Sequence, residues 1–521
     1  MRSIYQKRAD AGIDFIGSII YNSLEVSSMV FHSLTFFSFT ILILTLYWST
    51  HSLKKQNTIL FVANSIFYGC FNPEYLGLLF LSCYIDFYCG NKIFDSQGMK
   101  RKRFLMLSIF SNLSMLIIFK YYNFFVDSAI SFLSVLNVDI SPTLIHLAMP
   151  IGISYYTFQS MAYSIDVYND EIEPERDFVN FYVFVSFFPQ LVSGPIEKAS
   201  NLLQQVKKSR SLNFENVVKG LFLILVGYFK KLVIADRLLP MVQAIFENTE
   251  SFNSSLIYVL GVIFFWINLY CDFSGYCNIA SGLAKLFGFH IMDNFRNPFF
   301  AHSPSEFFRR WQISLTDWIT KYLYFPAAMK FGTPILALLV ALFIMGLWHG
   351  ASWIYASWGI VIFLQMVLFH LIERLYLKYI KKKFPISPLV KQSIQHFYIL
   401  FIFLPLIGLY FRSNSLSAFA KAMKAIGKLF TEGFHYHLQL LYGDLSHFSQ
   451  FLLFFRTDLV LALLLSFGLL IFQAFQGNQT VENFLEKKSM LTKFIFIFGV
   501  TFGLIFLRAT NHTDSYIYFR F

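Results

Sequence analysis

A histidine at position 349 stands between two long apolar runs and is followed directly by Gly350, Ala351 and Ser352. Imidazole is the side chain whose ordinary pKa lies nearest neutrality, so His349 could accept the proton of an attacking hydroxyl. The glycine-containing break would let this side chain face a polar cavity. The same histidine could instead make only a hydrogen bond at the end of a membrane span, and the residues alone leave both interpretations open.

A polar, glycine-containing segment from Tyr270 to Tyr276 follows another apolar run and carries Asp272 and Ser274. A carboxylate at membrane depth is costly unless a cation or a watery cavity faces it. The same stretch of chain offers three possible cationic partners, which are Arg296, Arg309 and Arg310. We expect Asp272 to form a structural ion pair, and the alternative is that it lines a permeation path.

The residues from Ser303 to Glu306 predict the start of a helix. Serine suits the N-cap, proline suits the first helical position, and the glutamate completes a capping box. One face of a continuous helix would hold Phe308, Gln312, Thr316 and Ile319, with Arg309 on another side. The same helix carries Arg310 and Trp311 beside Gln312, which makes it a second candidate part of a site.

Two cations follow a further apolar run, and both Lys231 and Arg237 could bind the phosphates of a nucleotide-like donor. Such residues more commonly extend their charged ends to lipid head groups. Trp348, which directly precedes His349, is the last candidate site residue.

The elements that must position these residues are membrane helices. The chain has 521 residues, of which 56% are hydrophobic and only 14% are charged. A soluble chain carries about 25% charged residues, so this composition indicates an integral membrane protein. The apolar runs are continuous and do not alternate, which predicts an all-α polytopic fold. We expect about eleven spans, with the remaining runs re-entrant or interfacial.

Two apolar regions contain helix breakers. The run of residues 178 to 194 ends in a segment with Pro189, Gly194 and Pro195, and another region is broken by Pro150 and Gly152. Backbone that is not helical at membrane depth is tolerated only against protein or a cavity. The segment from Phe187 to Ile196 is therefore expected either to line a cavity or to form a plain surface loop.

The net charge of +12 is concentrated in clusters beside the spans. By the positive-inside rule four clusters are expected to be cytoplasmic: Lys100 to Arg103, Lys207 and Lys208, Lys230 and Lys231, and Lys381 to Lys383. Residues 416 to 430 predict an interfacial helix with Lys421, Lys424 and Lys428 opposite Phe419, Met423 and Ile426. The lipid bilayer is the expected partner of these charges, and nucleic acid is not.

The five cysteines lie in or beside apolar runs without the context of metal ligands, so we expect small buried thiols and no metal. Residues 1–28 are polar and mixed and lack the apolar core of a signal peptide. We expect them to be an extension in front of one membrane domain, residues 29–521.

Seven motifs, in this order, resemble the membrane-bound O-acyltransferase family. They are Phe187 to Pro195, Lys230 to Arg237, Asp272 to Tyr276, Asn294 to Pro298, Glu306 to Leu315, Leu347 to Gly350 and Tyr516 to Phe521. The resemblance is closest to the bacterial branch that includes the alginate O-acetyltransferase membrane subunit and the D-alanyl transfer protein of teichoic acids. It implies a multi-pass protein of the bacterial cytoplasmic membrane, with a ring of helices around a tunnel.

The resemblance also implies a mechanism in which His349 is the catalytic residue. A cytoplasmic acyl thioester, acetyl-CoA above all, would enter from inside, and a hydroxyl of an exported polysaccharide, a cell-envelope polymer or a relay protein would approach from outside. No tightly bound cofactor is implied. An extracytoplasmic acyltransferase is a possible partner. The residues Asp272, Ser274, Tyr276, Arg309, Arg310, Trp311, Trp348, Lys231 and Arg237 would bind the donor or line the tunnel.

One position departs from the branch, which usually has Arg-Arg-Trp-His where this chain has Arg309, Arg310, Trp311 and Gln312. An amide cannot act as a base near neutrality, but it can orient a substrate or bind an oxyanion. Two other functions remain open: a channel or transporter, and a non-catalytic scaffold for a secreted acyltransferase.

Overall fold

The computed structural model describes residues 29–71, 73–138, 148–247, 255–413, 415–431 and 456–509. In these residues the chain is helical, and they contain no β-strand beyond one isolated antiparallel bridge between Phe295 and Trp311. The predicted all-α class is confirmed. Residues 1–28 and the motif from Tyr516 to Phe521 lie outside the described residues, so the division into an extension and one domain stays a prediction.

The described residues form the following helices in chain order. The N-terminal part forms α2 (Leu34–Trp48), α3 (Leu53–Gly69), α4 (Pro73–Phe94), α5 (Gly98–Leu116), η1 (Ile117–Tyr121), α6 (Tyr122–Val135), α7 (Ile153–Tyr168), α8 (Phe178–Ser186) and α9 (Leu202–Val206). The middle part forms α10 (Phe214–Tyr228), η2 (Phe229–Ala235), α11 (Asp236–Glu247), α12 (Ser255–Leu286), η3 (Pro298–Phe300), α13 (Pro304–Phe308), α14 (Ile313–Ile319), η4 (Thr320–Tyr324) and α15 (Phe325–Phe331). The C-terminal part forms α16 (Pro334–His349), α17 (Trp353–Leu375), η5 (Tyr376–Ile380), α18 (Pro388–Tyr398), η6 (Ile399–Phe403), α19 (Leu404–Arg412), α20 (Leu416–Thr431), α23 (Arg456–Gln476), α24 (Val481–Glu486) and α25 (Met490–Phe506).

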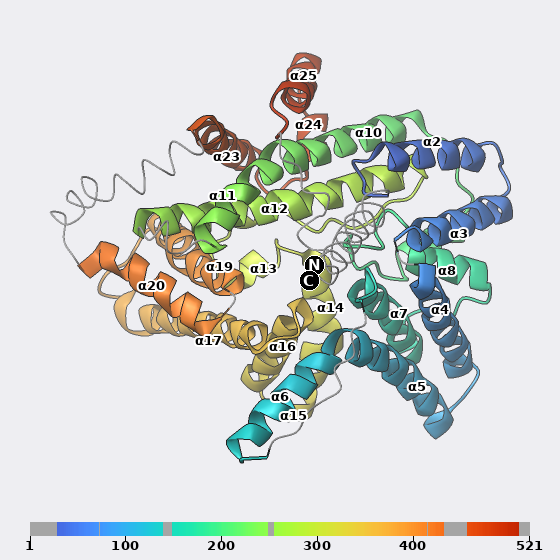
Figure 1. Ribbon diagram of the computed structural model, residues 1–521, viewed down its shortest axis with the longest axis horizontal. Coiled ribbons are helices and arrows are strands. Elements are labelled where there is room, and N and C mark those ends of the chain that lie inside the picture. Colours follow the sequence, from blue (N-terminus) through green and yellow to red (C-terminus); the bar gives the residue numbers. More distant parts are fainter. Residues whose placement is uncertain are drawn as a thin grey trace, which may run out of the picture.

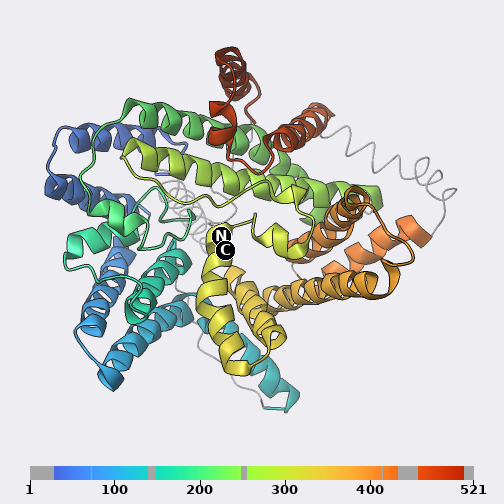
Figure 2. The same ribbon diagram turned by 180° about the vertical axis from the view of Figure 1, so that it is seen from behind.

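These helices surround the short helices α13 and α14 (Figure 1). Helices α2 to α5, α7 and α8 lie on one side and α16, α17, α19 and α20 on the other, which the view from behind also shows (Figure 2). The long helices α10, α11 and α12 join the two sides along one edge, and α23, α24 and α25 lie outside that edge. The arrangement agrees with the ring of helices that the sequence resemblance implies.

The protein is a multi-pass membrane protein. Five helices of the described residues are long and apolar enough to cross a bilayer: Gly98–Val135, Ile257–Leu286, Trp353–Ile380, Pro388–Arg412 and Asp458–Gln476. Three shorter helices are also apolar: Leu34–Trp48, Pro334–His349 and Met490–Phe506. The predicted total of about eleven spans stays a prediction, because several apolar runs do not form one long regular helix. The run of residues 178 to 194, for example, leaves the helix after Ser186.

The segment from Phe187 to Ile196 is buried throughout. Its backbone is held by side chains: Asn64 Oδ1 accepts from Phe188 N (3.1 Å) and Ser314 Oγ accepts from Ile196 N (3.0 Å). Gly152, at the other predicted break, has a left-handed φ of 75° and lies so close to Leu191 O that an added Cβ would be 2.6 Å from it. The surface-loop alternative is therefore wrong, and the two broken segments pack against each other.

Glycines hold α10 and α12 unusually close together. A Cβ on Gly227 would lie 2.6 Å from Gly275 O, and a Cβ on Gly282 would lie 2.5 Å from Gly220 O. Small residues of this kind let membrane helices approach to backbone contact. The contact brings η2, which continues α10, directly against α12.

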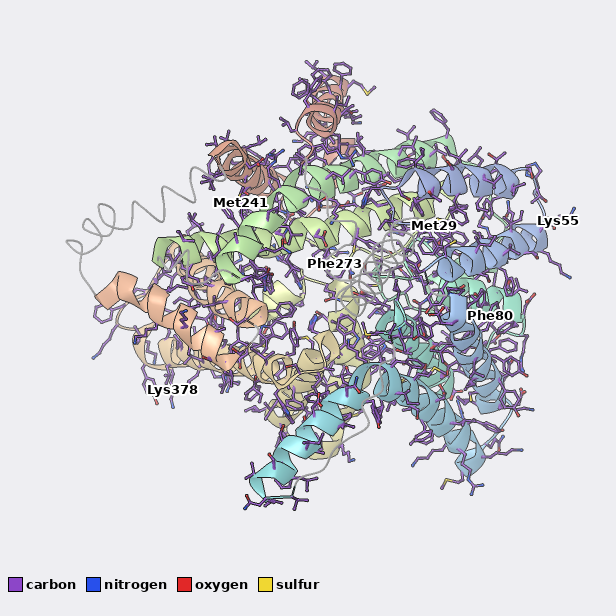
Figure 3. The ribbon with its side chains drawn as sticks, viewed as in Figure 1. Met29, Lys55, Phe80, Met241, Phe273 and Lys378 are labelled. Carbon is purple, nitrogen blue, oxygen red and sulfur yellow. The ribbon has the colours of Figure 1, made fainter. Side chains whose placement is uncertain are left out.

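Exposure follows the pattern expected of a lipid-facing surface. Phe273 is buried in the interior, whereas Lys55 and Lys378 lie exposed at the periphery (Figure 3). Helix α20 forms where the interfacial helix is predicted, with Lys421 and Lys424 exposed. Four cysteines are buried as predicted, but Cys70 is exposed.

Candidate active site

Helix α16 ends at His349, as the glycine-containing break predicts. Gly350 has extended backbone, and Ser352 caps the next helix by accepting a hydrogen bond from Ile354 N (3.4 Å). The imidazole is only 5% exposed. Its ring is edge-on to the rings of Trp358 (5.3 Å between centroids) and Phe411 (5.5 Å). The two rings fix the plane of the imidazole.

His349 and Gln312 line the same buried cavity, which has a volume of about 20 Å³. That volume is enough for one water-sized group. The remaining wall is mostly apolar and aromatic, with Trp266, Phe308, Trp311, Thr316, Met345, Trp358 and Phe411 among its residues. The structure therefore brings together the two residues that the sequence singles out for catalysis, although they are 37 positions apart.

The backbone at Gln312 is not helical, so the predicted continuous helix is wrong beyond Phe308. Gln312 has φ 44° and ψ 56°, in the left-handed region. The reason is a competing pairing with the preceding loop: Arg296 N donates to Arg310 O (2.9 Å) and Ile313 N donates to Asn294 O (3.0 Å). The predicted start is confirmed, since Ser303 Oγ accepts from Glu306 N (3.1 Å).

The break at Gln312 interrupts the helix, but three residues of the predicted face stay together. Phe308, Gln312 and Thr316 still line one cavity, and the hydroxyl of Thr316 donates to Phe308 O (2.9 Å) across the break. Gln312 Nε2 is buried and makes no hydrogen bond to any described residue. The left-handed backbone conformation of a residue other than glycine costs about 1 kcal/mol of conformational free energy. At Gln312 this conformation places an unpaired amide donor in the same cavity as His349.

Two residues that the sequence analysis missed hold the end of α16. Lys120 Nζ donates to Trp348 O (2.5 Å) and to Ser154 Oγ (3.3 Å), and the hydroxyl of Tyr121 donates to Leu347 O (2.9 Å). Both lie in the π-helical turn η1. The last carbonyl groups of a helix lack partners within it and carry partial negative charge. A single lysine inside an apolar run is the signal that could have identified Lys120.

Asp272 forms the predicted structural ion pair, but with a different partner. Lys231 Nζ lies 2.7 Å from Asp272 Oδ1 and 2.9 Å from Asp236 Oδ1, and all three side chains are at most 2% exposed. The expected partners Arg296, Arg309 and Arg310 do not form this pair. Lys230 and Lys231 are buried in η2 against α12 and do not lie exposed at a membrane surface, and their predicted cytoplasmic side stays a prediction.

The two cations proposed as phosphate ligands are both paired. Lys231 is enclosed by two carboxylates, and Arg237 pairs with Asp458 and donates to Leu507 O (2.6 Å). Their side chains tie η2 and α11 to α12, α23 and the end of α25. Donor binding by either residue stays a prediction that this geometry does not support.

The structure does not bring the other predicted site residues together. Trp311 lines the cavity of His349, whereas Arg309 lines a larger open groove and Arg310 pairs with Glu306. Trp348 packs edge-on to Tyr155, at 5.4 Å. Ser274 lines a separate polar cavity, and Tyr276 stacks on Phe31 at 4.8 Å.

The larger groove has a volume of about 800 Å³ and opens beside the cavity. It lies between α13, α14, η4, α16 and α17, and its polar residues include Arg309, His370 and Arg374. Phe308, Thr316 and Met345 border both the groove and the cavity. These three side chains are thus the boundary between an open, partly basic groove and the enclosed histidine.

This architecture defines a class, a polytopic α-helical membrane protein with a buried histidine and amide in a mostly apolar cavity at the end of a span. Comparison with known proteins makes the class specific. The model of the membrane-bound O-acyltransferase family, MBOAT, matches residues 175–412, a range that contains both His349 and Gln312. The chain belongs to this family.

Three relatives show how far the similarity extends. The chain is 34% identical to the probable alginate O-acetylase AlgI of Azotobacter vinelandii, over 64% of this chain and 66% of the relative. It is 34% identical to the protein of the same name from Pseudomonas putida, over 64% of this chain and 68% of the relative. It is 30% identical to the peptidoglycan O-acetyltransferase of Helicobacter pylori, over 70% of this chain and 73% of the relative. The chain thus spans about two thirds of the length of the AlgI relatives.

Proposed function

We propose that the protein is an O-acyltransferase that moves an acyl group, most simply acetyl, from a cytoplasmic thioester to a hydroxyl of an exported cell-envelope polysaccharide or of a relay protein. The observation that carries this proposal is the shared cavity of His349 and Gln312, in which a base and an unpaired amide donor meet. Family membership supports it, as do the relatives named for acetylation of alginate and peptidoglycan.

The groove beside the cavity suits an acyl thioester. Its wall is largely apolar, with Leu338, Ala341 and Leu342 of α16 along it, and Arg309 and Arg374 supply cations for the phosphates of a donor such as coenzyme A. Arg374 lies near the basic end of α17, which is followed by Lys381 to Lys383. By the positive-inside rule this end is cytoplasmic, so the donor would enter from the cytoplasm.

His349 would act as general base in the transfer step. The acceptor oxygen forms a bond to the thioester carbonyl carbon while His349 takes the hydroxyl proton. The carbonyl oxygen becomes negatively charged, and Gln312 Nε2 donates a hydrogen bond to it. The carbon–sulfur bond then breaks, and His349 returns the proton to the leaving thiolate. The histidine ends the cycle neutral, as it began.

The enclosure of the site has a chemical consequence. Bulky aromatic rings, among them Trp311, Trp358 and Phe411, surround the histidine and leave room for about one small group. An enclosed site limits hydrolysis of a reactive thioester by water. The proposal needs no resident cofactor, because the base, the amide and the thioester supply every group that the reaction uses.

The bacterial cytoplasmic membrane is the proposed location, since the donor is cytoplasmic and the acceptor is exported. An extracytoplasmic acyltransferase is the proposed partner when the acceptor is too large to reach the cavity itself. The channel alternative is not favoured, because Asp272, the carboxylate that would line its path, is 1% exposed and ion-paired.

The proposal is tested with the purified full chain in lipid nanodiscs, given acetyl-CoA with a labelled acetyl group and cell-envelope fractions. We expect label to move to the envelope fraction. His349→Ala should reduce the rate by about 10²- to 10⁴-fold, the usual contribution of a general base. His51→Ala, which changes an exposed histidine, should keep the rate of the natural protein. Transfer that persists in a folded His349→Ala protein would favour the scaffold function instead.

A further inference from the structure

Lys230 is a buried cation without a counter-ion among the described residues. Its side chain is 7% exposed, and Nζ donates one hydrogen bond, to Asn278 Oδ1 (2.8 Å), while lying 5.3 Å from the ring of Tyr270. The neighbouring Lys231 has two carboxylate partners, but no described carboxylate lies within 4.0 Å of Lys230. An ammonium group has three donors, and a buried charge is costly unless it is paired.

Lys230 lies where two spaces meet. The first is a polar crevice along α12 with a volume of about 60 Å³. One stripe of α12 lines it with Tyr270, Ser274, Cys277, Asn278, Ser281 and Lys285. Apart from the adjacent Cys277 and Asn278, these residues recur every three or four positions, so they share one face of the helix, and the stripe is about 22 Å long. It leads from the basic end of α12 inward to Lys230.

The second space is an apolar groove of about 320 Å³ outside η2. Its walls are α23 and α25, which lie outside α10 and α12 in Figure 1, and they supply residues such as Leu465, Phe472 and Phe496. Lys230 and Tyr270 line both the groove and the crevice. The outer faces of the same helices are exposed and apolar, as at Phe467 and Phe498, so the groove faces lipid.

The polar groups at this junction are incompletely paired. The Gln473 amide and the Ser274 hydroxyl are buried beside the hydroxyl of Tyr270, and neither side chain has a described partner within 3.5 Å in good hydrogen-bond geometry. Gln473 is 2% exposed and lines the groove beside Lys230. Buried polar atoms of this kind are normally paired in folded proteins. The Ser274 hydroxyl, the Gln473 amide and the Lys230 ammonium therefore lie together where the polar crevice meets the apolar groove.

The other charges of the crevice balance one another. Lys285 lies 3.2 Å from Glu482, and Asp293 lies 3.7 Å from Arg296. The ammonium of Lys230 is thus the cation of the crevice that makes no ion pair with a described carboxylate, and an anion would complement it locally.

We propose that the crevice and the groove together bind one anionic lipid. An oxyanion of the head group lies against the Lys230 ammonium and the Gln473 amide, and an acyl chain lies between α23 and α25. The same chemistry, an anionic oxygen with an alkyl chain, is offered by the phosphate of a phospholipid and by the carboxylate of a fatty acid. The site is separate from the cavity of His349, with which it shares no lining residue.

The head-group contact is tested by native mass spectrometry of the delipidated full chain with equal amounts of phosphatidylglycerol and phosphatidylcholine. We expect the natural protein to retain one phosphatidylglycerol and Lys230→Met to retain about tenfold less, as for one lost charged hydrogen bond. Lys55→Met removes an exposed lysine from the periphery and is the matched control (Figure 3). Equal retention by the Lys230→Met and Lys55→Met proteins, or equal retention of the two lipids, overturns the proposal.

The acyl chain is tested with glycine substitutions, which also serve if Lys230→Met does not fold. Gly468 lines the groove, and a Cβ built on it meets no atom within 4 Å. Gly468→Leu should therefore fold and fill the groove, and it should lower retention of phosphatidylglycerol about tenfold. Gly77→Leu places the same side chain at another open helical glycine, in α4, and should change nothing. Full retention by a folded Gly468→Leu protein contradicts the assigned place of the chain.

Competition with oleate separates the two sources of the anion. If oleate displaces phosphatidylglycerol from the natural protein but not the residual lipid of Lys230→Met, the site takes a fatty acid carboxylate. If phosphatidylglycerol stays bound, the site takes a phospholipid phosphate. Both results support the proposed site, because both require Lys230.

Discussion

At the scale of single residues, the site depends on one side chain in an unusual backbone conformation. Gln312 is left-handed because the chain on both sides of it pairs with residues 294 to 296 instead of continuing α13. Its amide nitrogen consequently enters the cavity of His349 without a hydrogen-bond partner among the described residues. A conformation that costs energy at this position is consistent with a role in binding the substrate.

Replacing Gln312 tests whether the amide stabilises the developing oxyanion. We expect Gln312→Leu to lower kcat of acetyl transfer by about 10²- to 10³-fold, the usual cost of one oxyanion donor. Gln312→Asn should keep more activity, because asparagine has an amide and tolerates positive φ. Steady-state kinetics with labelled acetyl-CoA measures both variants. Equal loss in the two variants would contradict this role, because Gln312→Asn keeps both an amide and a residue that tolerates positive φ.

Lys120 is the second residue whose role follows from geometry, as a positioning residue. Its ammonium donates to the carbonyl of Trp348, the residue before His349. We expect Lys120→Met to lower kcat at least about tenfold and to leave KM nearly unchanged, because donor binding does not involve this contact. Lys120→Arg retains a cationic donor and should restore part of the rate. A rise in KM with unchanged kcat would contradict the positioning role.

At the scale of elements, helix existence was predictable from the sequence and helix continuity was not. The break after His349 and the start at Pro304 follow from glycine, serine and proline, which act locally. The early end of α13 at Phe308 follows from pairing with Asn294 and Arg296, and Lys231 meets Asp272 only because glycines bring α10 and α12 together. Such tertiary contacts override local propensity and leave no local signal.

The close packing of α16 on α17 positions His349 at the end of α16. A substitution of Gly346, which lies at this contact, tests the packing. A Cβ on Gly346 would lie well inside contact distance of Tyr355 O, which is backbone and cannot turn away. We expect Gly346→Ala to destabilise the protein by about 1–3 kcal/mol, as overpacking does. Gly77→Ala in α4 meets no atom within 4 Å and should stabilise by up to about 1 kcal/mol through helix propensity. The melting temperatures and transfer rates of the two variants are measured in nanodiscs. An unchanged melting temperature in Gly346→Ala would refute this account of the packing.

At the scale of the whole molecule, the helices enclose the histidine and leave an open groove on one side of it. Phe308, Thr316 and Met345 border both spaces. Phe308 and Thr316 come from the chain that follows the predicted helix start at Ser303, and Met345 comes from the span that ends at His349. The histidine itself is almost fully buried. The direct route from the groove to the imidazole therefore passes these three side chains.

This route predicts that a large side chain at the boundary stops transfer without touching the base. We expect Met345→Trp to lower kcat/KM for acetyl-CoA by about 10²-fold, since displacing the reacting carbon by about 1 Å already costs that much. Leu336→Trp adds the same ring to an outward position of α16 that is 45% exposed, and it should leave the rate unchanged. Binding of acetyl-CoA, measured separately by calorimetry, should survive in Met345→Trp, because Arg309 and Arg374, the cations of the groove, are unchanged. A Met345→Trp protein that transfers acetyl at the normal rate would show that the donor reaches His349 from another direction, and the groove would then have no part in the reaction.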